Sequence, residues 1–480
     1  MALPIFRTKK TVLHEGKTMN GLASRAAERT ADDSARPRWT LIVTSIGFVV
    51  VQLDITVANV ALPEIAGEFG ASTSGLQWII DAYSLAFATL LLTAGVAGDR
   101  FGSRRIFLAG LVLFGLASLA CGLAPSTSIL IAARVAQGIG GALILPTSLA
   151  LIAHACGTDE AARIRMISWW SASGALAVAA GPMIGGFIIS GFGWRPIFLI
   201  NLPLCLLGIW WTRTKIAESA AHVDGKFDFA GLVSAALALF LLTGAVIEAG
   251  ARGWPDPLVL AGFAVAAIVG IAFFKIEAMT AKPMLPLGLF RLPGFSAAAF
   301  VGTVISLTFF GLVFVLSLYF QQVRGYSPAM AGLAFLPLTA VIMLANIAGG
   351  QLGARVGFWP PMVAGMLIAA AGNGLLAFLR LDSTAPFLPI ALGLFLISVG
   401  TGVAAPAMMS AALAKVEHAR SGTASAVLTT ARQVGGAVGI ALFGAFVAGG
   451  AQNIPAGSTL VFIVSTILLL LGAGASWFGR

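Results

Sequence analysis

The chain has 480 residues, of which 58% are hydrophobic and only 10% are charged. Soluble globular proteins carry about 25% charged residues, so this composition excludes a soluble enzyme or binding domain and indicates a polytopic membrane protein. The net charge of +10 does not indicate a nucleic-acid-binding protein, because the Lys and Arg residues lie almost entirely in short segments between long apolar runs.

Residues 1–38 form a polar N-terminal tail with eight Lys/Arg and four Asp/Glu residues. The tail has no apolar core of signal-peptide length. The first apolar run, 39–62, is too long for such a core and lacks a small-residue cleavage site. We therefore expect a disordered cytoplasmic tail followed by a retained spanning helix. The sequence leaves open whether Met1 or Met19 is the start.

The remainder of the chain is a succession of apolar runs. A helix needs about 20 apolar residues to cross the hydrocarbon core of a membrane. By this measure we expect an all-α protein with fourteen spans, at 39–62, 75–97, 106–123, 128–152, 166–190, 194–212, 229–249, 257–276, 295–320, 329–352, 360–379, 386–411, 421–449 and 457–478. The span 194–212 is the least regular, because Pro196 and Pro203 interrupt it.

The distribution of Lys and Arg predicts the orientation. If both chain ends are cytoplasmic, 23 of the 29 Lys/Arg residues lie on the cytoplasmic side and four lie outside. Positive residues accumulate in cytoplasmic loops, so this bias favours fourteen spans with cytoplasmic N- and C-termini. An odd number of spans would place the two ends on opposite sides. The two remaining cations, Arg134 and Arg432, lie within spans.

A repeated loop divides the chain into two halves. The segment GDRFGSRR (Gly98–Arg105) separates two spans, and a degenerate copy, GARVG (Gly353–Gly357), separates two later ones. Many secondary transporters are built from two such related halves. We expect a six-helix bundle at 39–212, a cytoplasmic linker at 213–228, an inserted helix pair at 229–276, a cytoplasmic loop at 277–294 and a second six-helix bundle at 295–480.

Three ionisable residues lie at a similar depth in the first bundle: Asp54, Asp81 and Arg134. Charges inside a membrane are costly and are functional candidates by default. We expect the three to form one group, in which the arginine keeps the carboxylates ionised while burial favours their protonated form. Such a carboxylate is a workable proton carrier. The alternative is a static ion pair that only fixes helix packing.

The fifth span contains GALAVAAGPMIGG (Gly174–Gly186). Its glycines, Gly174, Gly181, Gly185 and Gly186, allow a neighbouring helix to approach closely, and Pro182 permits a bend because it removes a backbone hydrogen bond. Generic tight packing is an equally simple explanation of this pattern.

No catalytic or metal-binding arrangement is visible. The four histidines (His14, His154, His222 and His418) are isolated, and the three cysteines (Cys121, Cys156 and Cys205) lie in or beside apolar runs without metal-ligand spacing. A phosphate-binding GxxxxGK[ST] loop is also missing. We expect neither an enzyme nor a bound metal or cofactor, and an ion gradient as the energy source.

Several motifs together resemble the major facilitator superfamily, and more narrowly its fourteen-span drug:proton antiporters. They are LDITVANVALP (Leu53–Pro63), GDRFGSRR, ARVAQGIGGALILP (Ala133–Pro146), GPMIGG (Gly181–Gly186) and WRPIFLINLP (Trp194–Pro203). The stretch Gln77–Gly95 is most similar to antibiotic exporters of the methylenomycin A resistance type. The resemblance covers about residues 39–478. Its motifs are specific in combination and weak singly.

The resemblance implies roles for matching positions. Asp54 is the position usually considered for protonation, Arg134 is linked to proton transfer, and Gly181 and Pro182 mark exchange rather than import. The inside loop, through Gly98, Asp99, Arg100, Gly102 and Arg104, would latch the two bundles in the outward-facing state. In the second-half copy Ala354 replaces the aspartate, so a latch built there would be weaker.

Candidates for the substrate cavity are aromatic residues on spans that border the centre, together with one cation: Trp78, Tyr83, Phe87, Trp169, Phe310, Phe314 and Arg432. Aromatic walls suit flat or apolar molecules. Ordinary packing or lipid contact explains such aromatics equally well. The charge of the substrate is left open.

These observations predict a proton-coupled antiporter that exports an amphipathic drug or antibiotic across the bacterial inner membrane. An exporter of a sugar, amino acid or siderophore is the alternative, because motifs do not identify cavity contacts. A non-transporting receptor or enzyme is the least supported reading, since no soluble signalling domain or catalytic group is visible. We expect a monomer in the lipid bilayer, with any accessory partner undetermined and no nucleic-acid partner.

Overall fold

The computed structural model describes residues 10–157, 159–217, 228–280, 283, 285–414, 416 and 421–478. In these residues the chain forms helices and no strand. Thirteen helices are long and apolar enough to cross a membrane, and the bent pair Thr73–Leu91 and Thr93–Phe101 makes fourteen if it is one span. The expected all-α membrane fold is confirmed.

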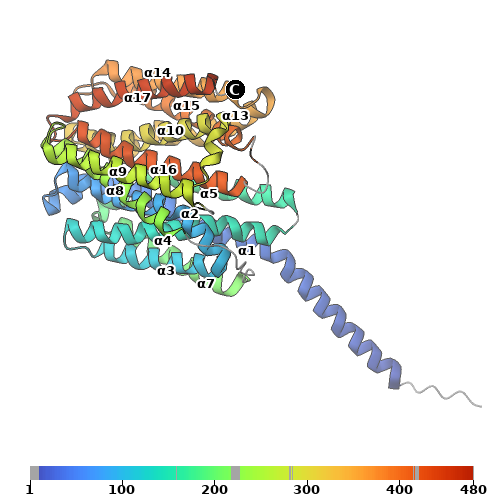
Figure 1. The fold of residues 1–480 in the computed structure, drawn as a ribbon. Coiled ribbons are helices and arrows are strands. Elements are labelled where there is room, and N and C mark those ends of the chain that lie inside the picture. The colour runs from blue at the N-terminus through green and yellow to red at the C-terminus, as the bar shows by residue number, and fades with distance from the viewer. Residues whose placement is uncertain are drawn as a thin grey trace, which may run out of the picture.

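The helices fall into two bundles and an inserted pair (Figure 1). The first bundle contains α1 (Lys10–Phe69), α2 (Thr73–Phe101), α3 (Ser103–Gly122), α4 (Thr127–Cys156), α5 (Glu160–Phe192), α6 (Pro196–Leu199) and α7 (Asn201–Lys215). The inserted pair is α8 (Phe229–Arg252) and α9 (Pro257–Met279). The second bundle contains α10 (Pro293–Leu318), α11 (Pro328–Ala334), α12 (Leu336–Thr339), α13 (Ile342–Val356), α14 (Trp359–Leu379), α15 (Phe387–Leu413), α16 (Ser421–Phe446) and α17 (Ile454–Phe478).

Two of the expected spans are broken. The sixth consists of α6 and α7, which meet at Ile200, and the tenth consists of α11, α12 and α13. Proline at the start of α6, α11 and α12 explains why helices begin there, since its fixed φ suits a first turn and it has no N–H to leave unpaired. The tenth span is therefore divided into three short helices.

The connecting segments are short. In the expected linker 213–228, α7 continues to Lys215 and Asp228 caps α8, while residues 218–227 lie outside the described part. The expected loop 277–294 contains the end of α9 and a 3-10 turn, η1 (Leu287–Arg291). A π-helical turn, η2 (Tyr319–Val323), ends the ninth span.

The N-terminal segment differs from the expected disordered tail. Helix α1 begins at Lys10 and continues past Pro37 into the first span, and its first part projects away from the bundles (Figure 1). Residues 10–36 include five Ala and three Arg, which have high helix propensity. Residues 1–9 lie outside the described part.

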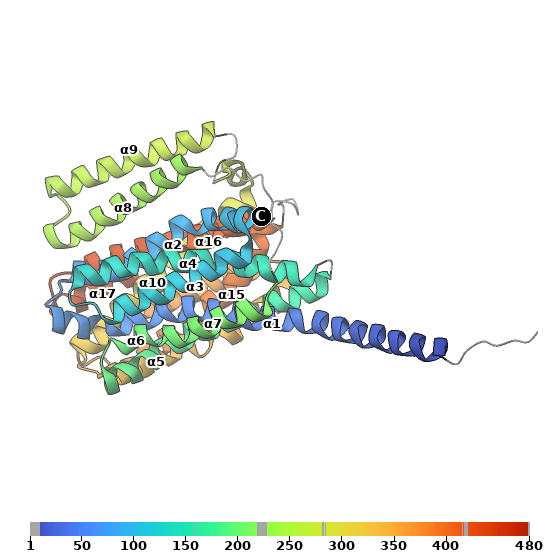
Figure 2. The same cartoon turned by 90° about the horizontal axis from the view of Figure 1, so that it is seen from below.

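The inserted pair lies along one side of the two bundles (Figure 2). Helix α8 packs against α2 of the first bundle and α16 of the second, whereas α9 packs chiefly against α8. Only 11% of the most apolar window of α9 is buried, compared with 78% for the window in α10. Helix α9 is therefore peripheral, and α8 lies next to the junction between the bundles.

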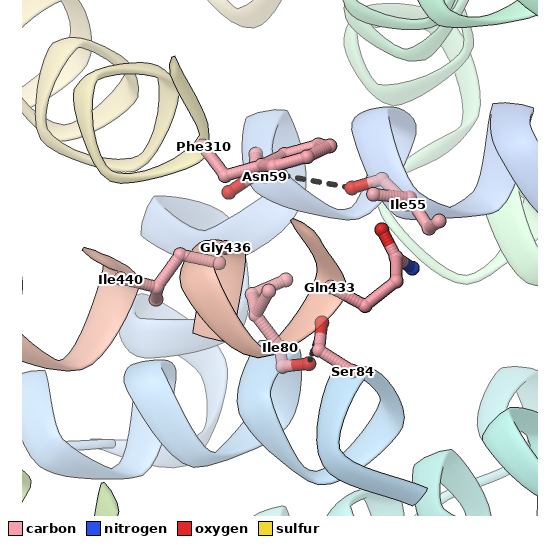
Figure 3. Close-up of a pocket in the computed structure, with 8 residues that line it drawn as sticks. All are labelled: Ile55, Asn59, Ile80, Ser84, Phe310, Gln433, Gly436 and Ile440. Atoms are coloured by element: carbon pink, nitrogen blue, oxygen red, sulfur yellow. Dashed lines mark hydrogen bonds between the residues drawn. The ribbon is translucent and has the colours of Figure 1, made fainter. Parts of the chain in front are cut away.

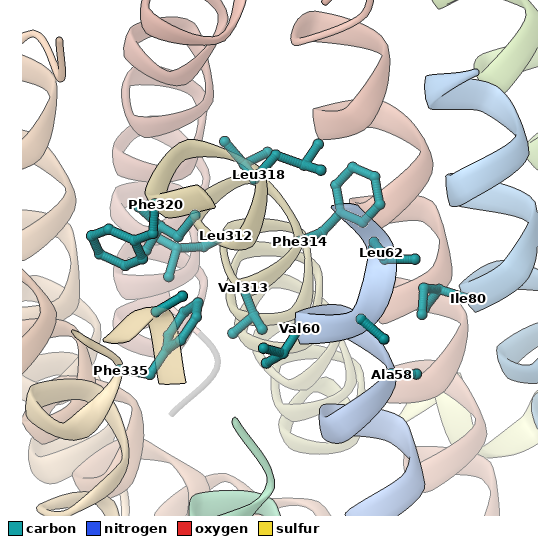
Figure 4. Packing of buried hydrophobic residues seen from close by; sticks show 14 of the residues in the cluster. Ala58, Val60, Leu62, Ile80, Leu312, Val313, Phe314, Leu318, Phe320 and Phe335 are labelled. Atoms are coloured by element: carbon teal, nitrogen blue, oxygen red, sulfur yellow. The ribbon is translucent and has the colours of Figure 1, made fainter. Parts of the chain in front are cut away.

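The largest apolar cluster joins the two bundles near the face at which α1 ends, the predicted outer face. It combines residues of α1 and α2, such as Val60, Leu62 and Ile80, with Phe314 and Leu318 of α10 (Figure 4). All five are at most 2% exposed. This packing closes the predicted outer face between the bundles.

Candidate functional site

The first element of the site is a polar cluster inside the first bundle, centred on Asp54 of α1. One oxygen of its carboxylate accepts a hydrogen bond from Arg134 Nη1 of α4, and the two groups form an ion pair. The other oxygen accepts hydrogen bonds from Gln137 Nε2 at 2.8 Å and Asn201 Nδ2 at 3.1 Å. Asp54 is 2% exposed and Arg134 is 0% exposed. The charges of this buried pair are therefore compensated, and both carboxylate oxygens have donors.

Arg134 is held by several neighbours besides Asp54. Its Nε donates to the backbone oxygen of Ile79 on α2 at 3.0 Å, and its Nη1 donates to Gln137 Oε1 at 2.7 Å. Its guanidinium carbon lies 4.3 Å from the centre of the Tyr83 ring, close enough for a cation–π interaction. The arginine thereby links α1, α2 and α4.

Three residues of this cluster were not predicted from the sequence: Ser118, Gln137 and Asn201. Gln137 Nε2 donates to Ser118 Oγ at 2.8 Å, and Asn201 Nδ2 donates to the same oxygen at 3.3 Å. Polar residues in otherwise apolar spans, with Gln137 one turn after Arg134 on the same helix, were the available signal. The cluster connects α1, α3, α4 and α7 within one bundle.

Asp81 does not join this cluster, so the expected three-charge group is wrong. Its carboxylate is 0% exposed, and neither oxygen has a hydrogen-bond partner among the described residues. Gln77, four residues earlier and thus on the same helix face, donates from Nε2 to Ala441 O of α16 at 2.7 Å. Asp81 therefore lies on the face of α2 that meets the second bundle, whereas Arg134 lies inside the first.

A narrow pocket, with room for about one water molecule, lies between the bundles and is lined in part by Ile80, the chain neighbour of Asp81. Its lining comes from α1, α2, α10 and α16, and consists of Ile55, Asn59, Ile80, Ser84, Phe310, Gln433, Gly436 and Ile440 (Figure 3). Asn59 donates to Ile55 O at 2.9 Å, while its Oδ1 has no donor within the described residues. The pocket offers neutral polar groups and one aromatic ring.

Most of the aromatic residues predicted to line the cavity have other surroundings. Phe310 lines the pocket. Trp78 packs against Phe240 of the inserted helix α8, with ring centres 5.2 Å apart. The others are placed as follows: Tyr83 and Phe87 in the core of the first bundle, Phe314 in the cluster that joins the bundles, and Trp169 69% exposed. Side-chain direction, which the span assignment does not give, accounts for these differences.

Hydrogen bonds between the bundles lie towards the predicted outer face. Ser317 Oγ donates to Asn59 O at 2.7 Å, and Gln321 Nε2 donates to Val60 O at 3.0 Å. Gln77 bonds α16, and the backbone N–H of Ala329 donates to Ser190 Oγ at 2.9 Å. Together with the apolar cluster, these bonds hold the bundles together on that side.

The glycines of α5 stand where other helices approach. A Cβ at Gly174 or Gly181 would collide with Phe48 or Thr56 of α1, and one at Gly185 would lie 3.2 Å from Val57 Cγ1. A Cβ at Gly186 would collide with Pro328 O of α11. One turn earlier on α5, the carbonyl of Pro182, the residue expected to permit a bend, lies against Gly332 of the same helix α11. The expected close approach is therefore present, and it involves both bundles.

The loop predicted to latch the bundles makes contacts within the first bundle. Arg104 donates to Thr212 O at 3.3 Å and to Arg213 O at 2.9 Å, both at the end of α7. Gly102 has φ 94°, which favours glycine, and a Cβ at Gly98 would lie 2.9 Å from Thr147 Cγ2. Asp99 and Arg100 are exposed, and the described residues show no ion pair between Asp99 and the second bundle.

Arg432 of α16 lies one helical turn from the pocket residue Gly436. Its Nε donates to Ser306 Oγ of α10 at 3.4 Å. Among the described residues, no group of three or more His, Cys, Asp or Glu side chains is placed to hold a metal ion.

The family model of the Major Facilitator Superfamily matches residues 44–440. The chain belongs to the major facilitator superfamily. It is 36% identical over 431 residues to the "Methylenomycin A resistance protein" of Streptomyces coelicolor, a match that covers 90% of each chain. It is also 34% identical over 409 residues to the "Multidrug resistance protein Stp" of Mycobacterium tuberculosis, covering 85% of this chain and 75% of that protein.

Solved structures share the fold. A bacterial homologue of the human lysosomal transporter Spinster, in an inward-facing and unoccupied conformation, superposes with a TM-score of 0.64 at 19% identity, covering 92% of this chain and 97% of that one. A peptide transporter in complex with sulfate superposes with a TM-score of 0.68 at 15% identity, covering 92% and 94%. The family match and the apolar helices of the described residues together show that the chain is a multi-pass membrane transporter.

Proposed function

We propose that the protein is a proton-coupled antiporter that exports drugs or antibiotics by alternating access. It would reside in the bacterial inner membrane with both termini cytoplasmic, as the bias of Lys and Arg indicates. A proton gradient would drive it without a cofactor, through exchange of protons for one small amphipathic molecule.

The observation that carries proton coupling is the environment of Asp81. A buried carboxylate without a donor is costly in its ionised form, so the neutral carboxyl is favoured while the outer side is closed. The surrounding α2–α16 contact joins the two bundles, which move apart in alternating access. Opening of the outer face would admit water to Asp81 and allow proton exchange.

Asp54 has a different role in this proposal. Its ion pair with Arg134 lies wholly inside the first bundle, where rigid-body movement of the bundles leaves its neighbours unchanged. The pair would fix helix packing, which is the alternative that the sequence left open. Proton transfer would then depend on Asp81.

Export of drugs is supported by the relatives. Proteins named for methylenomycin A resistance, multidrug resistance and tetracenomycin C resistance and export each align with 85–90% of this chain at 34–36% identity. These names cover different compounds, so they support a substrate class and not one molecule. The pocket between the bundles is too narrow in this conformation to hold such a compound, but its neutral, partly aromatic lining would suit one once the bundles separate.

The test is transport by the purified protein in vesicles with an acidic lumen. Methylenomycin A, tetracenomycin C and lincomycin are suitable compounds, because relatives are named for each of them. We expect accumulation of at least one compound, loss of the proton gradient, and abolition of accumulation by an uncoupler. Accumulation that an uncoupler leaves unchanged would exclude proton coupling.

An exporter of a sugar, amino acid or siderophore remains the second candidate, since the pocket also offers neutral hydrogen-bonding groups, including the unpaired Oδ1 of Asn59. Deleting the gene separates the two functions. A drug exporter predicts increased drug sensitivity with unchanged secretion, whereas a metabolite exporter predicts loss of a secreted compound and unchanged sensitivity.

A further inference from the structure

Three arginines form ion pairs with carboxylates in the described part of the chain, and Arg432 does not. Arg134 pairs with Asp54, Arg195 with Glu68, and Arg252 with Glu248. Arg432, in contrast, has one described hydrogen bond, from Nε to the neutral hydroxyl of Ser306, and no carboxylate partner in the part of the chain that the structure describes. Its positive charge is therefore uncompensated by the described side chains.

The position of Arg432 connects it to the pocket. Arg432 precedes Gly436 by one turn of α16, and Ser306 precedes Phe310 by one turn of α10. Both Gly436 and Phe310 line the pocket. The guanidinium thus lies about one turn from it, towards the predicted inner face, opposite to the bonds that close the outer side.

The local packing leaves space for the Arg432 side chain and covers it incompletely. Gly302 of α10 has no side chain, and a Cβ there would lie 3.1 Å from Arg432 Cγ. Arg432 itself is partly exposed, although it lies in the middle of α16. An uncompensated cation at such a depth is costly and normally faces a partner or a water-filled cavity.

We propose that Arg432 binds the anionic group of the exported molecule, so that the transported class consists of amphipathic organic anions, with a carboxylate as the simplest member. The inference rests on the proposed export function and names its substrate class. A guanidinium presents paired N–H donors that match a carboxylate, and Phe310 supplies an apolar ring for the remainder of the molecule. The lining residues themselves carry no opposing charge.

Binding of three matched probes to the purified protein tests this proposal. The probes are 2-naphthoate, 2-naphthamide and 2-naphthylmethylammonium, which share one ring system and differ in charge. Binding is measured by calorimetry in nanodiscs of zwitterionic phosphatidylcholine, which keeps anionic headgroups out of the assay. No proton gradient is present, so a failure of proton-coupled export leaves this test readable.

We expect the wild-type protein to bind 2-naphthoate about tenfold to a hundredfold more tightly than the amide, and the ammonium compound least. Arg432→Gln should remove the preference for the acid, and Arg432→Lys should retain part of it because the charge remains. Lys275→Gln, on the exposed face of the peripheral helix α9, is the control and should leave all three affinities unchanged.

Three results would overturn the proposal. One is equal or weaker binding of the acid compared with the amide, and another is no binding of the acid at all. The third is an acid preference that persists in Arg432→Gln protein with normal elution and thermal stability. The last result would show that Arg432 only packs between α16 and α10.

Discussion

Asp54 and Asp81 are both buried aspartates of the first bundle, but they differ in the number of hydrogen-bond donors around them and in their distance from the second bundle. Asp54 is surrounded by Arg134, Gln137 and Asn201 inside one bundle. Asp81 has no donor among the described residues and lies where α2 meets the second bundle. The comparison suggests that a compensated charge inside a rigid bundle maintains structure, whereas an uncompensated carboxyl at a moving junction can exchange a proton.

The largest expected effect is on transport, which should depend on the carboxyl group of Asp81. Asp81→Asn retains the side-chain size and removes the proton site, so uphill export should be lost completely. Exchange of substrate down its gradient should persist, because the bundles still move. Vesicle transport with and without a pH gradient measures both activities. If the Asp81→Asn protein exported substrate uphill at the wild-type rate, Asp81 would not be the coupling site.

The next largest effect is on the free energy of unfolding, which should depend on Asp54 and not on Asp81. Asp54→Asn leaves the buried Arg134 cation without its anion, which should lower the free energy of unfolding by about 3–5 kcal/mol. Arg134→Ala should destabilise the protein similarly and abolish export. Asp81→Asn should leave stability unchanged, because no described partner is lost. Thermal unfolding in detergent checks all three, and equal losses for Asp54→Asn and Asp81→Asn would contradict the comparison.

Smaller effects are expected from substituting Gln137 in the polar cluster around Asp54 and Gln433 in the pocket between the bundles. Gln137 bridges Asp54, Arg134 and Ser118, so Gln137→Ala should cost about 1–3 kcal/mol of stability. Gln433 lines the pocket, so Gln433→Ala should change substrate affinity with little change in stability. Unfolding and binding measurements on both variants form the check. The reverse assignment of effects would show that the cluster and the pocket have been distinguished wrongly.

The junction itself can be perturbed at Gly186, where a Cβ would collide with Pro328 O of the second bundle. Gly186→Ala should weaken closure of the predicted outer face by about 1–3 kcal/mol and increase the outward-open population. A Cβ at Gly191 on the same helix would meet no atom within 4 Å, so Gly191→Ala is the matched control. Spin-label distances across the outer face measure the populations, and identical distances in the two variants would refute the effect.

The smallest effect is expected at Asp99, which is exposed and has no described ion pair with the second bundle. If this loop latches the bundles only in the outward-facing state, Asp99→Asn should slow the transport cycle a few-fold and leave proton exchange intact. Turnover and proton release, measured on the same protein, would test this. A loss of proton release would place Asp99 in the coupling pathway instead.

Much of the fold was predictable. Long apolar runs predict the spans, the charges of the loops predict their orientation, and the repeated loop predicts the two halves. The pairing of Asp54 with Arg134 was also predictable, since the two opposite charges lie at a similar depth in the first and fourth spans of one bundle. The separation of Asp81 was not, because depth along a helix says nothing about the direction of the side chain around it. For the same reason Tyr83 and Phe87 were assigned to a cavity although they pack inside the bundle.

The glycines of α5 illustrate a second limit of prediction from the sequence. The spacing of Gly174, Gly181 and Gly185 predicted a close helix neighbour, and the structure identifies that neighbour as α1. The contact of Gly186 with α11 depends on how the two bundles meet, which no local pattern encodes. The pocket between the bundles has the same origin, since its lining combines α1 and α2 with α10 and α16, which are distant from them in sequence.

Isotope-edited infrared spectroscopy of the purified protein in lipid, with carboxyl-labelled aspartate, tests most directly whether Asp81 holds the exchangeable proton. A protonated carboxyl band should be present in the wild-type protein at neutral pH and disappear as the pH is raised. The band should be absent from Asp81→Asn and retained in Asp54→Asn. Persistence of the band in Asp81→Asn, with its loss in Asp54→Asn, would show that the proton resides on Asp54 and would contradict the proposed division between the two aspartates.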